Sequence, residues 1–183
     1  MRDTEQSPVE LELVVGDIAA QEDFDAVVNA ANAQLRTGGG VAGALHRAAG
    51  PGLEAECRPL APIEPGEAVI TSGHRLPNRY VIHCLGPVYG RDEPSDELLA
   101  SCYREALRLA EENQVRSIAF PAISTGAFGF PAEPAARIAL GAVLEQAPRL
   151  DTVERIRFVL YDSTALELHE RILDEVVGES GPE

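Results

Sequence analysis

The chain has 183 residues and a formal net charge of −15, and all 15 of its basic residues are arginine. The absence of lysine excludes a P-loop lysine, a Schiff base to pyridoxal phosphate and any lysine nucleophile. The acidic surplus argues against nucleic acid and anionic membranes as partners. This length favours a single domain over residues 1–183, in which we expect residues 1–8 to be frayed and residues 177–183 to form a disordered tail.

The cysteines and the hydropathy of the chain limit which metal sites, disulfides and cellular locations the sequence predicts. Cys57, Cys84 and Cys102 are odd in number and widely spaced, so the sequence predicts neither a disulfide framework nor a metal site. We expect no metal and no cofactor. Since the sequence shows no secretory signal and no apolar run of about 18 residues, we expect a cytoplasmic protein, and we expect a monomer.

The first predicted element is a half-buried strand. Apolar residues alternate with glutamates from Val9 to Val15, and one face carries Val9, Leu11, Leu13 and Val15. Asp17 at the end of this strand is favoured as a helix N-cap, and the alternative is a carboxylate that points at a ligand. A short apolar run from Ala26 to Asn29 then predicts a strand buried inside the sheet.

A polar loop rich in glycine follows this second strand. Gly38, Gly39 and Gly40 lack a Cβ atom, so their backbone can come within contact distance of a ligand. Helical spacing predicts a helix that begins at about Gly40, with inward positions at Val41, Ala44, Leu45 and Ala48. The unpaired amides and the dipole of a helix start favour an anion, so the loop is a candidate phosphate site. The alternative is a turn that only packs a helix on a strand.

The same glycines satisfy the dinucleotide pattern G-x-G-x-x-G through Gly38, Gly40 and Gly43. That pattern places a glycine directly after the strand and an acidic residue at the end of the next strand. Here ten positions separate Val28 from Gly38, and a proline-rich loop occupies the downstream region. The spacing therefore argues against a Rossmann-type dinucleotide fold.

The rest of the chain alternates between strands and helices. Predicted strands cover Glu67–Ser72, Tyr80–Cys84, Ser117–Pro121 and Arg155–Tyr161, and predicted helical segments cover Gly52–Arg58, Ser95–Asn113, Pro131–Gln146 and Ala165–Val176. The longest of these helices should turn inward Leu98, Leu99, Cys102, Ala106, Leu109 and Ala110. His83 and Cys84 are adjacent on a strand and face opposite sides, so they cannot form a Cys/His pair and should pack in the core. The alternation predicts the α/β class, with helices on both faces of a largely parallel sheet.

A second glycine loop, Ser124–Gly129, also follows a buried strand and precedes a helix. Ligands of such sheets bind outside the carboxyl ends of the strands, so both loops should lie at that edge, where two amide-rich loops would suit a pyrophosphate. The loop lacks the G-x-S-x-G elbow, which argues against a Ser-His-Asp hydrolase.

Polar and aromatic side chains near the two loops complete the predicted site. Asn29 and Asn32 carry amides suited to ribose hydroxyls, although N-A-A-N is often only a turn. Phe128 and Tyr161 stand where the rim of a ligand site is expected, and a base stacked on such a ring gains about 1–3 kcal/mol. Core or rim packing is the alternative for both aromatics.

The sequence resembles the macrodomain family in segments that occur in order and span almost the whole chain. They are G-D-I (Gly16–Ile18), V-N-A-A-N (Val28–Asn32), G-G-G-V (Gly38–Val41), A-L-H-R-A-A-G-P (Ala44–Pro51), Y-V-I-H (Tyr80–His83) with G-P (Gly86–Pro87), and I-A-F-P-A-I-S-T-G (Ile118–Gly126). The middle of the chain is most similar to the MacroD-type ADP-ribosyl hydrolases. The G-G-G-V-A and F-V-L-Y-D stretches resemble the archaeal-type ADP-ribose binders instead. The resemblance implies a three-layer α/β/α fold with a mixed sheet and ADP-ribose in a cleft at the sheet edge.

The resemblance also implies a role for each site residue. Asp17 and the amide of Ile18 would hold adenine, and Tyr161 would stack on it. Asn32 would hold the distal ribose, while Asn29 would sit nearby and order the loop. The diphosphate would lie between the amides of Gly40, Val41 and Ala42 and those of Ser124, Thr125, Gly126, Ala127 and Phe128. The ring of Phe128 would also pack on the distal ribose.

One position departs from the family. MacroD-type hydrolases carry G-G-G-V-D, with an aspartate that acts on the distal ribose or a catalytic water, and Ala42 stands there in this chain. Alanine cannot serve as a general base. His46 lies one helical turn further on the same face, and it is either a catalytic residue or, slightly favoured, a packing residue.

Two accounts of function follow from this departure. The chain is either a non-catalytic reader of ADP-ribose or a slow hydrolase of ADP-ribosyl esters or O-acetyl-ADP-ribose. In the second account Asn32, His46 or the substrate's own phosphate orients the water. An ADP-ribose 1″-phosphate phosphatase is a third and less favoured reading. In each account free ADP-ribose or ADP-ribosylated proteins are the expected partners.

Overall fold

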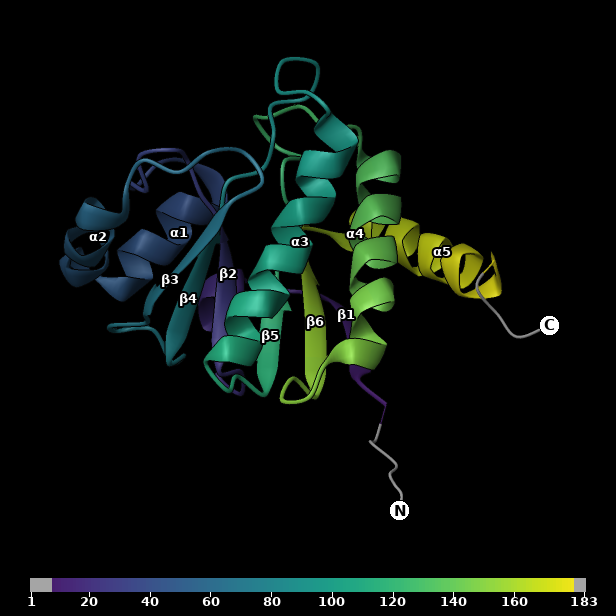
Figure 1. The fold of residues 1–183 in the computed structure, drawn as a ribbon, viewed down its shortest axis with the longest axis horizontal. Coiled ribbons are helices and arrows are strands. Elements are labelled where there is room, and N and C mark those ends of the chain that lie inside the picture. Colours follow the sequence, from purple (N-terminus) through teal and green to yellow (C-terminus); the bar gives the residue numbers. More distant parts are fainter. Residues whose placement is uncertain (1–7, 180–183) are drawn as a thin grey trace.

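The computed structural model describes residues 8–179, which form a sheet with helices packed around it (Figure 1). The strands are β1 (Glu10–Val15), β2 (Ala26–Ala30), β3 (Ala68–Ser72), β4 (Tyr80–Cys84), β5 (Ser117–Phe120) and β6 (Arg155–Leu160). The α-helices are α1 (Gly40–Ala49), α2 (Pro51–Cys57), α3 (Ser95–Glu112), α4 (Ala132–Gln146) and α5 (Ser163–Glu179). Short 3-10 helices occur at η1 (Ile18–Ala20), η2 (Arg58–Leu60) and η3 (Ala147–Arg149).

The strands form one sheet in the order β1-β6-β5-β2-β4-β3. Every neighbouring pair is parallel except β3 and β4, so the predicted mixed, mostly parallel sheet is confirmed. Because parallel strands share an orientation, the loops that follow β1, β2, β4, β5 and β6 all leave the same carboxyl edge. Both glycine loops are among them.

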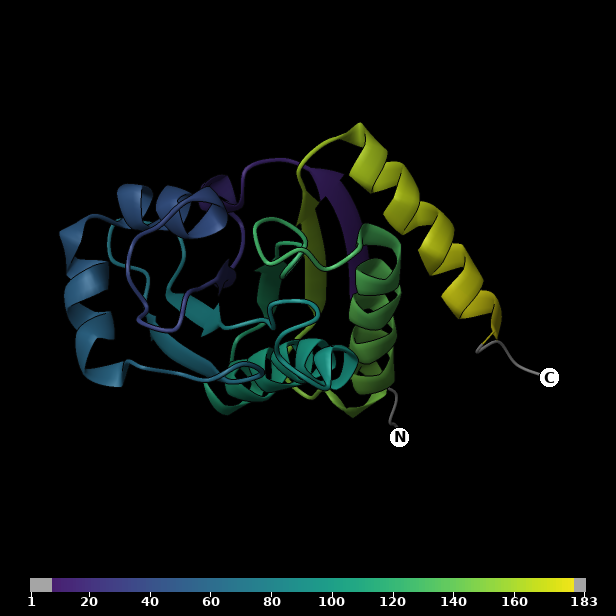
Figure 2. The ribbon, with the colours of Figure 1, turned by 90° about the horizontal axis from the view of Figure 1, so that it is seen from above.

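Helices cover both faces of the sheet, which gives the fold three layers (Figure 2). α3 and α4 pack on one face over a core cluster that includes Leu99, Phe120 and Phe158. α1 and α2 pack on the other face over a smaller cluster that includes Val27 and Leu45. α5 packs against α4 and β1 at one side of the sheet. No helix within residues 8–179 is long and apolar enough to cross a membrane.

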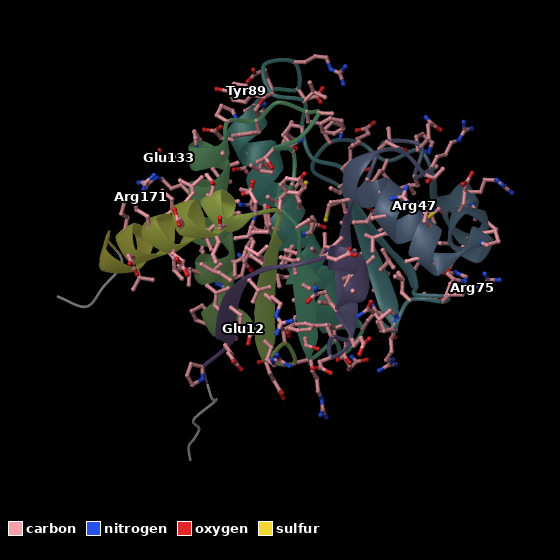
Figure 3. The ribbon with its side chains drawn as sticks, turned by 180° about the vertical axis from the view of Figure 1, so that it is seen from behind. Glu12, Arg47, Arg75, Tyr89, Glu133 and Arg171 are labelled. Carbon is pink, nitrogen blue, oxygen red and sulfur yellow. The ribbon has the colours of Figure 1, made fainter. Side chains whose placement is uncertain are left out.

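The face that α1 and α2 cover is open over β1 and β6, where it carries charged side chains (Figure 3). Arg157 Nε donates to a Glu12 carboxylate oxygen at 2.9 Å. The guanidinium groups of Arg155 and Arg157 lie over the ring of Phe24, at 4.6 and 4.5 Å from its centroid. Ion pairs and cation–π contacts therefore take the place of a helix layer on this half of the sheet.

The predicted helices and strands are present in the structure, but the buried faces of some of them differ from the predicted ones. Val15 is 47% exposed, so the inward face of β1 ends before it. On α1, Ala49 is buried and Ala48 is exposed, which rotates the inward face from the predicted one. α3 buries two bulky side chains that the predicted inward set omits, Tyr103 and Leu107.

The predicted chain ends also need correction. α5 begins at Ser163 and continues to Glu179, so Val177 and Gly178 are helical and do not belong to a tail. Residues 1–7 of the predicted frayed start, and residues 180–183 of the predicted tail, lie outside the described range.

Candidate ligand-binding site

The first glycine loop closes directly onto the start of α1. Gly39 is the N-cap in an extended conformation, and Gly40 takes a left-handed φ of +56° that favours glycine. A Cβ atom at Gly39 or Gly40 would meet no other atom within 4 Å, so both glycines present bare backbone to open space. A Cβ at Gly43 would overlap the carbonyl oxygen of Gly38, so only glycine lets the loop lie this close to the helix. The loop therefore has the bare approach and the helix start of an anion site.

The two asparagines of this loop have different partners. Asn32 accepts a hydrogen bond from the Arg36 amide at 3.0 Å and donates to the Arg36 carbonyl at 2.9 Å, so its side chain ties the loop to itself. Asn29 is buried in β2, and its Nδ2 lies 3.0 Å from His83 Nδ1 on β4. Asn32 therefore holds the loop directly, and the role expected of Asn29 in ordering the loop stays a prediction.

His83 is the centre of a buried polar network. Its Nε2 lies 3.0 Å from Thr71 Oγ1 on β3 and 3.7 Å from Cys57 Sγ on α2. Because Asn29 Nδ2 is a donor, His83 Nδ1 accepts and Nε2–H donates to Thr71, a tautomer that holds only while the ring is neutral. Burial and then the neighbouring His46 lower the pKa of His83 to about 3.

Neither histidine nor cysteine chemistry is activated in this network. Burial, followed by Glu56 and Glu54, raises the pKa of the Cys57 thiol to about 11, so the contact with His83 does not create a thiolate. Cys84 is buried on the opposite side of the sheet, as the sequence predicts. Within residues 8–179 no group of three or more His, Cys, Asp or Glu side chains could hold a metal ion.

Ala42 and His46, one turn apart on α1, are both buried, with exposed fractions of 5% and 6%. Neither ring nitrogen of His46 has a hydrogen-bond partner among residues 8–179. Burial lowers the pKa of His46, and the nearby Glu54 offsets part of this shift. The ring lies near enough to His83 to help lower the pKa of that histidine.

The second glycine loop is anchored to the loop that follows β4. Ser124 takes a left-handed φ of +69° and donates through Oγ to the Pro87 carbonyl at 2.9 Å. The Tyr89 amide donates to the Phe128 carbonyl at 2.9 Å. A Cβ at Gly86 would overlap Ser124 Oγ, so glycine is required for this contact. The hydroxyl of Ser124 therefore has a structural partner, while its loop stays at the carboxyl edge.

Gly126 lies at the tip of this loop, where its backbone borders open space. A Cβ there would meet no atom within 4 Å, and its φ is not left-handed. Thr125 Oγ1 turns inward and donates to the Ala122 carbonyl at 3.2 Å. Gly126 and Ala127 are exposed, so their backbone is accessible from the solvent side.

The structure brings three of the predicted site residues onto one apolar cluster. Ile18 is part of the cluster under α1, and Val41 packs against it from the first turn of α1 and Phe128 from the second glycine loop. Both loops therefore border the same apolar cluster at the carboxyl edge of the sheet.

The residues expected at adenine lie at the ends of β1 and β6, which pair in parallel with Val15 opposite Leu160. Asp17 caps η1, accepting from the Ala19 amide at 2.9 Å, so the favoured N-cap role is confirmed. Tyr161 follows β6 and is 91% exposed. It therefore packs on no core, and its ring is free for a planar ligand.

Three residues that shape the site lie outside the predicted set. Gly43 and Gly86 permit the close contacts of the two loops, and the buried Tyr103 on α3 accepts from the Ile123 amide at 3.2 Å through its hydroxyl. The third glycine of G-x-G-x-x-G is a signal for Gly43. Gly86 and Tyr103 contact residues that lie far from them in the sequence, so no local sequence pattern predicts these contacts.

A mostly parallel sheet between helices, with two bare glycine loops at its carboxyl edge, defines a three-layer α/β/α protein whose candidate site offers exposed backbone. A family model described as Macro domain matches residues 28–139. The chain belongs to the Macro domain family.

Known proteins agree with this membership. A Macro domain-containing protein of Methanosarcina mazei is 48% identical, covering 88% of this chain and 87% of its own. The ADP-ribose glycohydrolase MACROD2 of Xenopus laevis is 47% identical over 91% of this chain, which spans 40% of that longer relative. A variant of the Oceanobacillus iheyensis macrodomain, solved with ADPR, superposes with a TM-score of 0.87 at 39% identity, covering 92% of this chain and 94% of its own.

Proposed function

We propose that this chain binds ADP-ribose, free or attached to protein, at the carboxyl edge of its sheet. The observation that carries the proposal is the pair of glycine loops at this one edge, with open backbone at Gly39, Gly40 and Gly126. Such backbone can approach a diphosphate without a steric barrier, and the start of α1 favours its charge. The macrodomain relative solved with ADPR supports the choice of ligand.

Within this proposal each end of the ligand has its own partners. The exposed Tyr161 stacks on adenine, beside Asp17 and the amide of Ile18. The amides of Gly40, Val41 and Ala42 face the diphosphate from one side and those of Ser124 to Phe128 from the other. Asn32 and the ring of Phe128 contact the distal ribose, with Asn32 using the hydrogen-bonding capacity that Arg36 leaves unused. Asn29 lies inside β2, where it bonds to His83, and it does not contact the ligand.

We propose further that the chain hydrolyses ADP-ribosyl esters slowly. The name of the Xenopus relative supports a hydrolase, whereas Ala42 removes the general base and the buried His46 is poorly placed to replace it. Asn32 and the phosphate of the substrate are then the groups left to orient a water. O-acetyl-ADP-ribose belongs to the same class of ester. We place this activity in a cytoplasmic monomer.

Two measurements test the proposal in sequence. Titration calorimetry with free ADP-ribose should show saturable binding, and absence of binding at millimolar ligand would refute it. ADP-ribose release from a protein modified on glutamate or aspartate, followed at substrate excess, then separates the two readings. Repeated slow turnover identifies an enzyme, and binding without release identifies a reader. Phosphate release from ADP-ribose 1″-phosphate would identify the phosphatase reading.

A further inference from the structure

The arginines of this chain fall into two groups by their partners. Within residues 8–179, ion pairs with glutamate or aspartate hold arginines on α3, α4, α5 and β6 and in the loop before α3: Arg91, Arg104, Arg108, Arg137, Arg155, Arg157 and Arg171. None of these lies on α1 or α2. The paired arginines are therefore neutralised locally by the acidic surface around them.

The second group has no carboxylate partner within the described chain. Four of its members surround α1 and α2, and the other three are Arg79, Arg116 and Arg149. Arg36 precedes α1, Arg47 lies on it, Arg58 begins η2 and Arg75 lies between β3 and β4. Figure 3 shows Arg47 and Arg75 on this side of the molecule. We call these four residues the arginine surface.

Few acidic groups offset the arginine surface. Residues 31–61 and 73–79 hold five arginines and only two glutamates, in a chain whose formal net charge is −15. One of these glutamates, Glu56, is occupied by His74 Nε2 at 2.7 Å and the Ser72 amide at 3.2 Å. Within these two ranges Glu54 is then the remaining carboxylate. The surface is therefore a positive island on an acidic protein.

The island borders the first glycine loop. Arg36 and Arg58 line one surface hollow of about 170 Å³, together with Gln34, Leu35, Glu54 and Ala61. Arg36 is the residue whose backbone Asn32 holds. A Cβ atom added at Gly43 would lie 3.0 Å from Arg47 Nη1. The carbonyl oxygen of Gly38 lies beside the same point, so Arg47 is close to the first glycine loop. The arginine surface therefore adjoins the loop at which we propose that the ligand binds.

We infer that the arginine surface binds acidic residues that flank the modified side chain of an ADP-ribosylated protein. The inference rests on the proposed function, because the ADP-ribosyl group supplies the attachment point. Guanidinium groups match carboxylates in geometry and stay charged at any physiological pH. An acidic substrate segment would be repelled by the rest of this molecule, so a local positive surface is what admits it. A nucleic acid, with its long run of phosphates, extends into the repulsive surface and is disfavoured.

The test uses the full chain and two peptides that carry ADP-ribose through the same non-hydrolysable linkage. The peptides differ only in their flanks, which are aspartate and glutamate in one and asparagine and glutamine in the other. At about 0.1 M salt we expect the acidic peptide to bind about 3- to 10-fold more tightly, the effect of a few exposed ion pairs. Near 1 M salt the preference should vanish, because charges are screened within about 3 Å.

Matched variants locate the effect. Arg47→Gln with Arg58→Gln should abolish the preference for the acidic peptide and leave the affinity for free ADP-ribose unchanged. Arg116→Gln with Arg149→Gln removes the same charge from two exposed arginines outside α1 and α2, and should keep the preference. Equal loss in both double variants would overturn the inference, since only net charge would matter.

The remaining outcomes separate this inference from the proposed function. Equal affinity of the unaltered chain for both peptides, with free ADP-ribose still bound, would overturn the inference alone. No binding of free ADP-ribose would refute the proposed function and the inference with it. A single-stranded oligonucleotide carrying the same ADP-ribosyl group is the competitor. If it bound as tightly as the acidic peptide, the assignment of an acidic protein partner would be wrong.

Discussion

At the scale of single residues, position 42 offers a direct test of the proposed hydrolysis. We expect Ala42→Asp to raise ADP-ribosyl ester hydrolysis on the order of 100-fold, since a positioned general base contributes at least this much. Position 42 is buried in the first turn of α1, where the helix dipole offsets part of the cost of burying a carboxylate, and the melting temperature of the variant checks that it folds. Multiple-turnover release of ADP-ribose measures the effect, and calorimetry should show nearly unchanged binding.

Ala42→Asn is the control for this prediction, because asparagine has the size of aspartate without its basic carboxylate. Hydrolysis by the asparagine variant should stay at the level of the unaltered chain. Equal turnover in all three proteins would show that the aspartate of related macrodomains has no counterpart at this site.

Gly126 tests the second loop without disturbing the core. A Cβ there meets nothing within 4 Å and the φ is ordinary, so Gly126→Val should fold with an unchanged melting temperature. The valine side chain fills the open space above the loop and should abolish ADP-ribose binding in calorimetry. Gly141→Ala, in α4 with equally open surroundings, is the control and should bind normally. Retained affinity in Gly126→Val would exclude this loop from the diphosphate site.

At the scale of elements, the His83 network joins β2, β3, β4 and α2 and should make stability depend on pH. The pKa of His83 is about 3 in the folded chain and near 6.5 when unfolded, so only the unfolded chain takes up this proton between those values. The contribution of His83 is thus fully present above pH 6.5 and is lost as pH falls toward 3. The loss should approach about 1.4 kcal/mol per pH unit.

Urea unfolding at several pH values between 7.5 and 4.5 measures this dependence. His83→Gln keeps an amide that can bond to Asn29 and Thr71 but cannot be protonated, so its free energy of unfolding should fall less steeply toward acid. His74→Gln replaces an exposed histidine and serves as the control. Identical slopes in the unaltered chain and His83→Gln would mean that the buried ring does not control this pH range.

The same elements show what the sequence can and cannot predict. Strand bounds and both glycine loops follow from period-2 patterns and from runs of glycine, which act locally. The inward face of α1 does not, because alanines at 42, 44, 48 and 49 are too alike for spacing to choose between them. The pairing of Asn29 with His83 depends on the register of β2 and β4, which lie far apart in the chain. The burial of His46 likewise depends on how α1 packs against other elements, which the sequence around His46 does not indicate.

At the scale of the whole molecule, the net charge of −15 should make salt stabilising. Raising sodium chloride from about 0.1 to 1 M shortens the screening distance from about 10 to 3 Å and relieves repulsion across the acidic surface. Exposed ion pairs weaken at the same time, but each contributes only about 0–1 kcal/mol. We expect the melting temperature to rise by about 2–4 °C for each kcal/mol of relieved repulsion. Choline chloride at equal ionic strength controls for sodium binding, and a falling melting temperature would contradict the prediction.

The hydrogen bonds between Asn32 and Arg36 have a consequence for the thermodynamics of recognition. They order residues 32–36 of the loop between β2 and α1 during folding, when ordering each residue costs about 1–2 kcal/mol in conformational entropy. A ligand that reaches a loop already ordered does not bear that cost again. Ligands at this site are then ranked by how well they match a fixed set of amides, and differences between them should appear mainly in how slowly they leave.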